Sequence, residues 1–325
     1  MTKHPHLLIN CDLDWVPDME EFKTELSQRF ETITVVEQSA SLENEPLSTV
    51  THWITNPAPR FKITRELIDR SMPNLQTIGS PSTGVTHIEP SLKHSGVSVF
   101  CLQDIPKSEL NRITASSEFT FLLFLEIVRK AKVFHHADLL KWRDDLKIFR
   151  GRQVSGMTVL IFGCGRIGSN LGRYLTAFDA TVLFYEPDTA KHSEDHEFIP
   201  FDRIDETLRS VDAAFLCFHW NESNENFFDR SRLDAMRRDA FLVNTSRGEN
   251  IDEAYLCDLV EDGKFAGVGL DVLRNEQSDA LKNARMLELE KTTERLIVTP
   301  HIAGSSVDSE RIAFFSIYGL ISGEA

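Results

Sequence analysis

The chain has 325 residues, about twice the usual size of one domain, so we expect two domains. Apolar residues make up 41% and charged residues 26%, an ordinary globular balance with enough apolar material for two cores. Acidic residues outnumber basic ones by 50 to 35, and the net charge of −15 argues against general binding to nucleic acid or anionic membrane surfaces.

The chain shows no pattern for secretion, membrane insertion or metal binding. Its most apolar stretch, Phe119 to Val128, contains Glu126 and is far shorter than the roughly 20 residues of a spanning helix. The N-terminal apolar run is too short for a secretory signal. The 5 cysteines are scattered and never spaced as Cys-x-x-Cys, which argues against disulfides and structural zinc. We therefore expect a cytoplasmic protein with reduced thiols and no metal.

Short apolar runs alternate with polar, helix-like segments over roughly the first hundred residues. This alternation predicts a parallel sheet covered by helices on both faces. We expect strands at His6–Asn10, Thr32–Val36, Val50–Thr55, Leu75–Ile78 and Val97–Leu102. We expect helices at Asp18–Phe30, Thr64–Ser71 and Glu89–His94.

The pattern changes near Ala115, where a long apolar helix is predicted over FTFLLFLEIVRKAKVF. The segment Val133–Phe149 that follows mixes apolar side chains with charges. It fits either part of the core or an amphipathic arm that covers a partner subunit.

A second α/β series begins at Met157. Its strands are expected at Thr158–Phe162, Thr181–Tyr185, Ala213–Phe218, Phe241–Asn244, Val268–Leu270 and Leu296–Val298. Helices fit Arg166–Phe178, Ile204–Ser210, Ser231–Met236 and Ile251–Glu261. The acidic stretch Lys191–Glu197 is interpreted as a solvated loop. A last amphipathic helix follows His301.

The sequence Gly163-Cys164-Gly165-Arg166-Ile167-Gly168 fits the pattern GxGxxG between a predicted strand and a predicted helix. Gly163 allows a tight turn, Gly165 lets the backbone approach a pyrophosphate, and Gly168 permits close packing of helix on strand. The helix N-terminus offers unpaired N–H groups to the anion. This setting predicts a dinucleotide site of the Rossmann type.

Glu186 stands at the end of the next predicted strand. A carboxylate there accepts hydrogen bonds from the adenosine ribose hydroxyls and repels a 2′-phosphate. Pro187-Asp188-Thr189 supplies no arginine that would compensate, so the sequence favours NAD over NADP.

Four segments in order resemble the D-isomer-specific 2-hydroxyacid dehydrogenases: the stretch from Ile161 to Asp188, NTSRGENIDEAYL, GVGLDVLRNE and TPHIAGSS. The resemblance implies an NAD-dependent, dimeric oxidoreductase acting on a small 2-hydroxy or 2-keto acid. It implies a flavodoxin-like α/β substrate domain, residues 1–105 plus 300–325, into which the Rossmann-type NAD domain, residues 106–299, is inserted.

The resemblance places the family's catalytic residues on Arg247, Glu276 and His301. A guanidinium can bind a carboxylate and stabilise charge developing on oxygen. An imidazole can deliver or remove the proton, and a neighbouring carboxylate favours its protonated form. Glu276 is followed by Gln277, where the family usually has proline.

Further residues correspond to the family's binding positions. The resemblance assigns cofactor contacts, beyond the glycine turn and Glu186, to Trp220, Thr245, Ser246, Asp271 and Gly304. It assigns substrate binding to Ser82, Thr83 and Gly84, whose backbone amides would hold a carboxylate together with Arg247. His87, close to that turn, is expected to be structural.

Three other functions stay open from the sequence. The same fold serves NAD(H)-sensing corepressors, and phosphite oxidation also occurs in the wider family. Asp12 and Asp14 after an apolar run resemble the nucleophile segment of haloacid-dehalogenase-type phosphatases, but no later segment completes that site. Arg60 and Lys62 either hold a second anion, such as a substrate phosphate, or are solvated surface charges.

Overall fold

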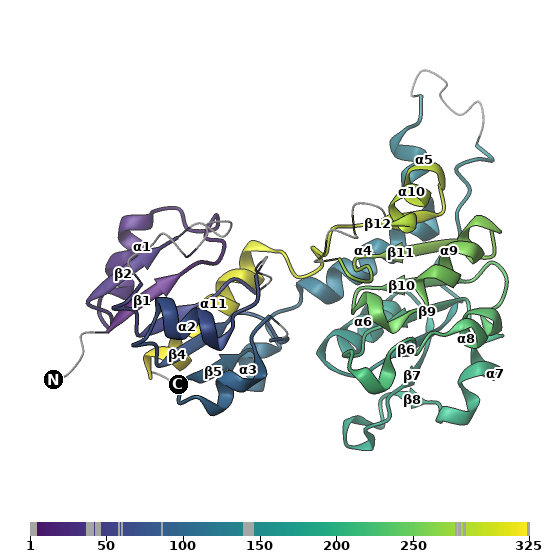
Figure 1. Cartoon of the computed structure of the whole chain (residues 1–325). Helices are drawn as coiled ribbons and strands as arrows, with labels where there is room; N and C mark the ends of the chain where they lie inside the picture. Colours follow the sequence, from purple (N-terminus) through teal and green to yellow (C-terminus); the bar gives the residue numbers. More distant parts are fainter. Residues whose placement is uncertain are drawn as a thin grey trace. The chain divides into compact units, whose positions relative to one another are not determined.

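The computed structural model describes residues 5–36, 42, 47–57, 59, 61–85, 87–138, 146–276, 278, 281 and 284–323. Packing contacts divide the chain into two compact units, Met1–Ile113 with Ser305–Ala325, and Thr114–Gly304 (Figure 1). The predicted domain boundaries, near residues 105 and 300, lie close to the limits of these two units. The assignment of one unit to the substrate and the other to NAD stays a prediction. Arg60, Gln277 and residues 139–145 of the predicted arm lie outside the described residues.

The first unit contains a parallel five-stranded sheet in the order β2-β1-β3-β4-β5. This order is that of flavodoxin-like proteins, as expected for the N-terminal unit. Its strands are β1 His6–Ile9, β2 Thr32–Val35, β3 His52–Ile54, β4 Thr77–Ser80 and β5 Ser98–Cys101. Its helices are α1 Met19–Leu26, α2 Arg65–Ser71, α3 Lys107–Leu110, α11 Val307–Ser322 and a 3₁₀ turn at Pro90–His94.

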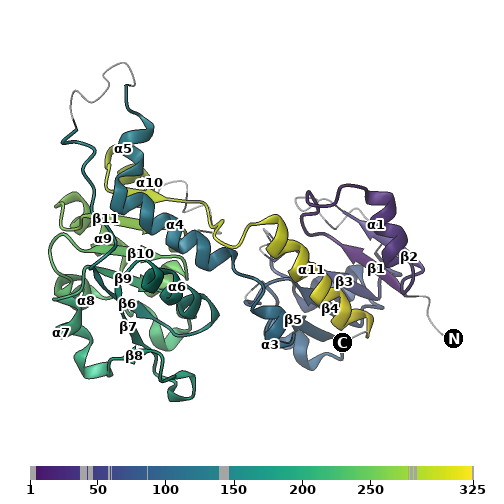
Figure 2. The ribbon, with the colours of Figure 1, turned by 180° about the vertical axis from the view of Figure 1, so that it is seen from behind.

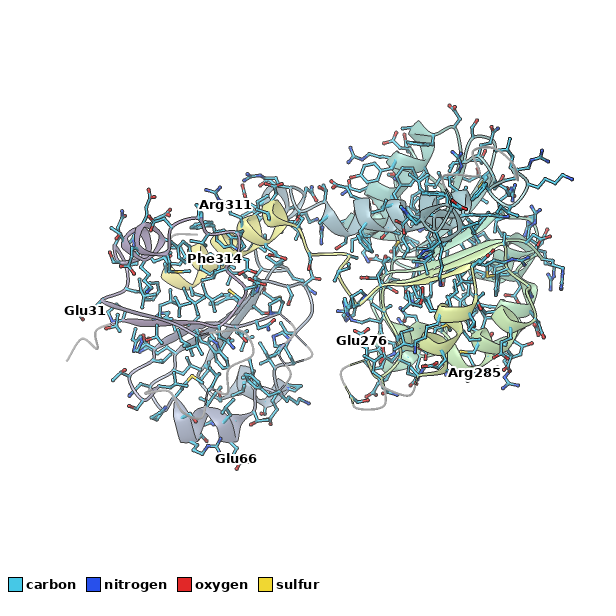
Figure 3. The ribbon with its side chains drawn as sticks, turned by 90° about the horizontal axis from the view of Figure 1, so that it is seen from above. Glu31, Glu66, Glu276, Arg285, Arg311 and Phe314 are labelled. Carbon is cyan, nitrogen blue, oxygen red and sulfur yellow. The ribbon has the colours of Figure 1, made fainter. Side chains whose placement is uncertain are left out.

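Alternation along β1 divides the apolar side chains of this unit between two cores. Leu7 and Ile9 pack with α1 and with Phe314 of α11, whereas Leu8 packs with Ile68 of α2 on the other face. Figure 3 shows Phe314 on α11 and Glu66 on α2 at opposite faces of this unit. The last helix of the chain therefore completes the first unit.

The second unit is built on a parallel seven-stranded sheet in the order β12-β11-β10-β9-β6-β7-β8. Six of these strands have the doubly wound order of dinucleotide-binding domains, and the predicted fold class is confirmed. The strands are β6 Thr158–Phe162, β7 Thr181–Tyr185, β8 Glu197–Phe198, β9 Ala213–Leu216, β10 Phe241–Asn244, β11 Gly267–Leu270 and β12 Leu296–Val298.

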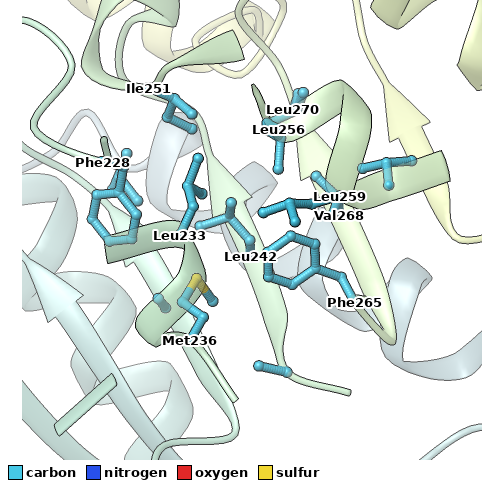
Figure 4. Packing of buried hydrophobic residues seen from close by; sticks show 14 of the residues in the cluster. Phe228, Leu233, Met236, Leu242, Ile251, Leu256, Leu259, Phe265, Val268 and Leu270 are labelled. Atoms are coloured by element: carbon cyan, nitrogen blue, oxygen red, sulfur yellow. The ribbon is translucent and has the colours of Figure 1, made fainter. Parts of the chain in front are cut away.

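Helices cover both faces of this sheet (Figure 2). The helices are α4 Ala115–Arg129, α5 Ala131–His135, α6 Arg166–Ala177, α7 Ile204–Leu208, α8 Arg230–Ala235, α9 Glu253–Glu261 and α10 Arg285–Thr292. α4 and α6 pack on one face, with residues such as Phe215. α7 to α10 pack on the other, where Leu242 and Phe265 lie in a large apolar cluster (Figure 4).

The long helix predicted from Phe119 onward is broken. α4 ends at Lys130, which has φ of 56°, and the separate short helix α5 follows. The Val128 carbonyl accepts the Arg152 N–H at 3.0 Å, so the returning chain satisfies a group that a continued helix would have used. The prediction of one continuous helix was wrong at this point.

Within the described residues, no helix is long and apolar enough to cross a membrane, and the five cysteines are free thiols. Part of the stretch interpreted as a solvated loop forms β8, which extends the sheet beyond β7.

His87 is a buried titratable group of the first unit, with only 7% of its surface exposed. Burial lowers the pKa of its imidazole to about 4. Its Nε2 lies 3.3 Å from the Ser80 hydroxyl, so the neutral ring is accommodated by a hydrogen bond.

We expect this histidine to make stability dependent on pH. Because its pKa is lower when folded, the unfolded chain binds more protons between about pH 6.5 and 4, and the free energy of unfolding falls as pH falls through that window, by on the order of 3 kcal/mol. Urea unfolding should show a weaker pH dependence in His87→Gln than in the wild type. Equal dependences over that window would contradict the assignment.

Candidate functional site

The predicted cofactor and catalytic residues of the second unit follow the carboxyl ends of its parallel strands. The glycine turn follows β6 and Glu186 follows β7, while Arg247 follows β10 and His301 follows β12. In doubly wound sheets, ligands bind along this edge. One edge of one sheet therefore carries the candidate site.

The glycine turn has the shape that each glycine was expected to provide. Gly163 has φ of +98°, and a Cβ there would lie 2.8 Å from the Cys217 carbonyl oxygen. A Cβ on Gly168 would overlap the Gly163 carbonyl, so α6 packs directly on the turn. A Cβ on Gly165 would meet nothing within 4 Å, and no side chain caps α6 there. The uncapped N-terminus of α6 therefore fits a pyrophosphate.

Glu186 is buried, with 9% of its surface exposed. Its carboxylate accepts the N–H of Cys164 at 3.0 Å and that of Asp188 at 3.1 Å, which ties it to the glycine turn. The Lys191 ammonium lies 3.5 Å from the same carboxylate and 3.7 Å from Asp188. The residue beside the predicted ribose position is thus already paired with a cation.

Arg247 lies in a loop that is held by its own neighbours. Asn244 at the end of β10 accepts the N–H and hydroxyl of Ser246 and donates to the Arg247 carbonyl. The Thr245 hydroxyl is 2.6 Å from that of Thr120 in α4. Asn250, which is fully buried, donates to Ser246 and to the Phe218 carbonyl. These bonds fix the start of the loop.

The Arg247 side chain is half-buried and donates to the neutral Ser246 carbonyl at 2.6 Å. Among the described residues, no ion pair to a carboxylate involves it. Desolvation, together with the charge of Arg247, lowers the pKa of His219. A half-buried guanidinium without an acidic partner is suited to binding an incoming anion.

Glu276 and His301 are in direct contact. The Glu276 carboxylate forms a short hydrogen bond with Nδ1 of His301 and also accepts the Leu273 N–H at 3.0 Å. His301 Nε2 has no partner among the residues that the structure describes. The ring is therefore anchored through one nitrogen and open through the other.

Asp271 holds the turn that carries His301. It is fully buried, and its carboxylate accepts the Thr299 hydroxyl at 2.6 Å and the N–H groups of Ile302 and Ala303 at 2.9 and 2.8 Å. Burial raises the pKa of Asp271, and these three bonds act in the opposite direction. His301 has φ of +56°, an uncommon conformation that this clamp maintains.

Two further predicted cofactor residues lie on the same side of the unit. Trp220 follows β9, and its buried indole N–H has no acceptor in the described part of the chain. Gly304 lies near α4, where an added Cβ would be 3.7 Å from the Ser116 hydroxyl. An indole N–H without an acceptor is compatible with a polar ligand.

The predicted substrate turn belongs to the first unit. Its carbonyls are occupied: Ser82 O accepts the Leu102 N–H, Thr83 O accepts the Gln103 amide at 2.9 Å, and Gly84 O accepts the Ser82 hydroxyl. Its backbone N–H groups have no acceptor among the described residues. The turn therefore presents donors, as a carboxylate site requires.

Asp12 and Asp14 form an ordinary polar turn. Both are exposed, and the Asp12 carboxylate accepts the Asp14 N–H at 2.9 Å. The described residues contain no cluster of three or more potential metal ligands.

Two contacts of this edge were missed by sequence reasoning. The contact of Lys191 with Glu186 has little sequence signal, because Lys191 lies one short 3₁₀ turn beyond Asp188. Arg274 had no sequence signal at all, yet its guanidinium joins three loops, as described below.

Comparison with known proteins identifies the family that this chain matches. The model for "D-isomer specific 2-hydroxyacid dehydrogenase, NAD binding domain" matches residues 121–303. A D-specific alpha-keto acid dehydrogenase of Enterococcus faecium is 30% identical over 236 residues, 70% of this chain and 68% of that protein. A D-lactate dehydrogenase of Staphylococcus aureus is 28% identical over 198 residues, 58% of each chain.

Solved structures share the fold. D-2-hydroxyisocaproate dehydrogenase has a TM-score of 0.81 at 17% identity, covering 99% of this chain and 98% of that one. The Aquifex aeolicus D-lactate dehydrogenase, in complex with NAD and lactic acid, has a TM-score of 0.77 at 24% identity, covering 98% and 96%.

Proposed function

Because the chain belongs to the D-isomer-specific 2-hydroxyacid dehydrogenases and is an NAD-dependent oxidoreductase, we propose that it interconverts a small 2-keto acid and its D-2-hydroxy acid with His301, Glu276 and Arg247 as catalytic residues. The observation that carries this proposal is the contact between Glu276 and His301 at the strand edge expected to bind the dinucleotide.

In the direction of reduction, the keto oxygen gains a proton while the carbonyl carbon gains a hydride. NADH supplies the hydride when bound. His301, protonated and oriented by Glu276, gives its Nε2 proton to the keto oxygen. Arg247 binds the substrate carboxylate and stabilises the negative charge that develops on the keto oxygen. In oxidation, neutral His301 accepts the hydroxyl proton.

The turn Gly163, Gly165, Arg166, Ile167 and Gly168 would hold the pyrophosphate, mainly through backbone N–H groups. Glu186 would accept from the adenosine ribose. Trp220, Thr245, Ser246, Asp271 and Gly304 are proposed for the remaining cofactor contacts. The inward bonds of Asp271 indicate that it acts in large part by holding the His301 turn.

The substrate carboxylate would also be bound by backbone amides at Ser82, Thr83 and Gly84. The support is local: every carbonyl of that turn is already hydrogen-bonded, which leaves its N–H groups for an anion.

The catalytic assignment is tested by NADH oxidation with glyoxylate, hydroxypyruvate, phenylpyruvate, branched keto acids and phosphohydroxypyruvate. His301→Ala should lower kcat by roughly 100- to 10,000-fold, because the proton donor is lost, while NADH affinity measured by fluorescence changes little. Unchanged turnover in this variant would remove the acid/base role. Tight NADH binding by the wild type without turnover of any keto acid would favour an NAD(H)-sensing protein instead.

The cofactor preference is tested by fluorescence titration with NADH and NADPH. Glu186→Gln should tighten NADPH binding relative to NADH, because the carboxylate that repels a 2′-phosphate is gone. Lys191→Gln should weaken NADPH binding by about fivefold, the value of one surface ion pair, and barely alter NADH binding. Lys291→Gln, which removes a lysine paired with Glu288 on α10, is the control. Equal effects on both cofactors would exclude a role at the 2′ position.

We also propose a homodimer formed through the predicted arm Val133–Phe149, which begins within α5. Phe134, Leu146 and Ile148 are each about half exposed there, at 45%, 45% and 49%. Sedimentation velocity should show a dimer that Phe134→Glu with Ile148→Glu converts to monomer, whereas Phe201→Glu, at a 60% exposed phenylalanine outside the arm, leaves it intact. A monomeric wild type would refute the arrangement.

A further inference from the structure

The segment from Asp271 to Glu276 leaves β11 and carries two proposed site residues. Its backbone is held at two points besides Asp271. Leu273 donates its N–H to Glu276, and Arg274 donates its N–H to Glu253 of α9 at 2.7 Å. Asn275 then has φ of 56°, which turns the chain so that Glu276 faces back toward Leu273.

The Arg274 guanidinium binds two other loops. Nη1 lies 2.7 Å from the Glu225 carboxylate, and Nη2 lies 2.5 Å from the Asn226 side-chain oxygen. Nη2 also donates to the carbonyls of Glu249 and Ile251 at 3.1 and 3.3 Å. A planar guanidinium can serve several acceptors at once, which a lysine ammonium does with less geometric definition.

These acceptors place Arg274 against the loop of Arg247. Glu249 and Ile251 follow Arg247 and Gly248 directly, and an added Cβ on Gly248 would overlap the backbone of Leu273 and Arg274. The Arg247 loop and the Glu276 segment are therefore in direct backbone contact, and the Arg274 side chain fastens them together.

Arg274 also offsets repulsion among carboxylates. Burial raises the pKa of Glu253, the charges of Glu249 and Glu276 act in the same direction, and Arg274 opposes them. Without the guanidinium, Glu253 would face Glu249 and Glu276 with less compensation.

We propose that Arg274 is a positioning residue that keeps Glu276 against His301 and in register with Arg247. The inference rests on the proposed catalytic roles of these three residues. Arg274 acts only through them: it fixes the loop on which Glu276 stands, and a displaced carboxylate holds the imidazolium less well. Residues that support reacting groups in this way typically contribute about 10- to 100-fold to activity.

The experiment compares Arg274→Ala, Arg274→Lys and Glu276→Gln in the full-length protein. The readout is the alkaline limb of the pH profile of kcat/KM in keto-acid reduction, because this direction of the reaction needs a proton donor. A carboxylate favours the protonated form of a neighbouring imidazole. Weakening the contact between Glu276 and His301 should therefore move this alkaline limb to lower pH. Among the described residues, Glu253 interacts electrostatically with Glu276 and Asp271 with His301, and neither of these carboxylates is altered. We expect Glu276→Gln and Arg274→Ala to move the limb in the same direction, with kcat lowered about 10- to 100-fold in Arg274→Ala.

Three further measurements separate positioning from general destabilisation. The double variant Arg274→Ala with Glu276→Gln should be no slower than Glu276→Gln alone, because both changes remove one interaction. Arg274→Lys, which keeps the charge, should recover part of the activity even if Arg274→Ala does not fold. Arg285→Ala, which breaks comparable ion pairs to Asp258 and Glu261 between α10 and α9, should leave the limb unmoved.

The outcomes are distinguishable. An unmoved limb in Arg274→Ala, or additive losses in the double variant, would overturn the positioning role alone. Should Arg274→Ala not fold, wild-type activity in Arg274→Lys would overturn it instead. If Glu276→Gln itself left the limb in place, the proposed pairing of Glu276 with His301 would fail, and this inference with it.

Discussion

The candidate site depends on the buried carboxylate of Asp271. Burying a charge is costly, and burial raises the pKa of this group. Three donors from Thr299, Ile302 and Ala303 offset the cost, and together they make up the turn around His301. Because a left-handed conformation of a residue other than glycine persists only where its surroundings impose it, the position of His301 is set from the end of the neighbouring strand.

Close backbone contacts are the second constraint on the site. Gly168 packs on the Gly163 carbonyl, and Gly248 packs on Leu273 and Arg274, with no room for a Cβ in either place. The first contact fixes α6 against the phosphate-binding turn. The second joins the loop after β10 to the segment after β11. These backbone contacts limit how far the loop of Arg247 and the segment of Glu276 can move independently of each other.

Much of this arrangement could be predicted because its causes are local in the sequence. Apolar runs with intervening helical periodicity located the strands of both sheets except β8. The glycine turn, with φ of +98° at Gly163, followed from the spacing of three glycines. The pairing of Glu276 with His301 was expected from a family resemblance, since residues so far apart in the sequence show no local signal of contact.

Features that depend on distant contacts could not be predicted in the same way. The helix break at Lys130 has no glycine or proline to mark it. It coincides with the return of the chain at Arg152 and with Lys132, whose ammonium binds Glu290 and carbonyls near the start of β12. The contacts of the Arg274 side chain are likewise invisible in sequence, because its acceptors come from two loops that lie far from it in the sequence.

The net charge of −15 gives little information about the candidate site. The carboxylates along the strand edge are occupied by internal donors: Glu186 by backbone N–H groups and Lys191, Asp271 by its turn, and Glu276 by Leu273 and His301. Arg247, by contrast, donates to a neutral carbonyl and has no carboxylate partner among the described residues. The proposed anion site at Arg247 would therefore act over a short range, where the diffuse surface charge is largely screened.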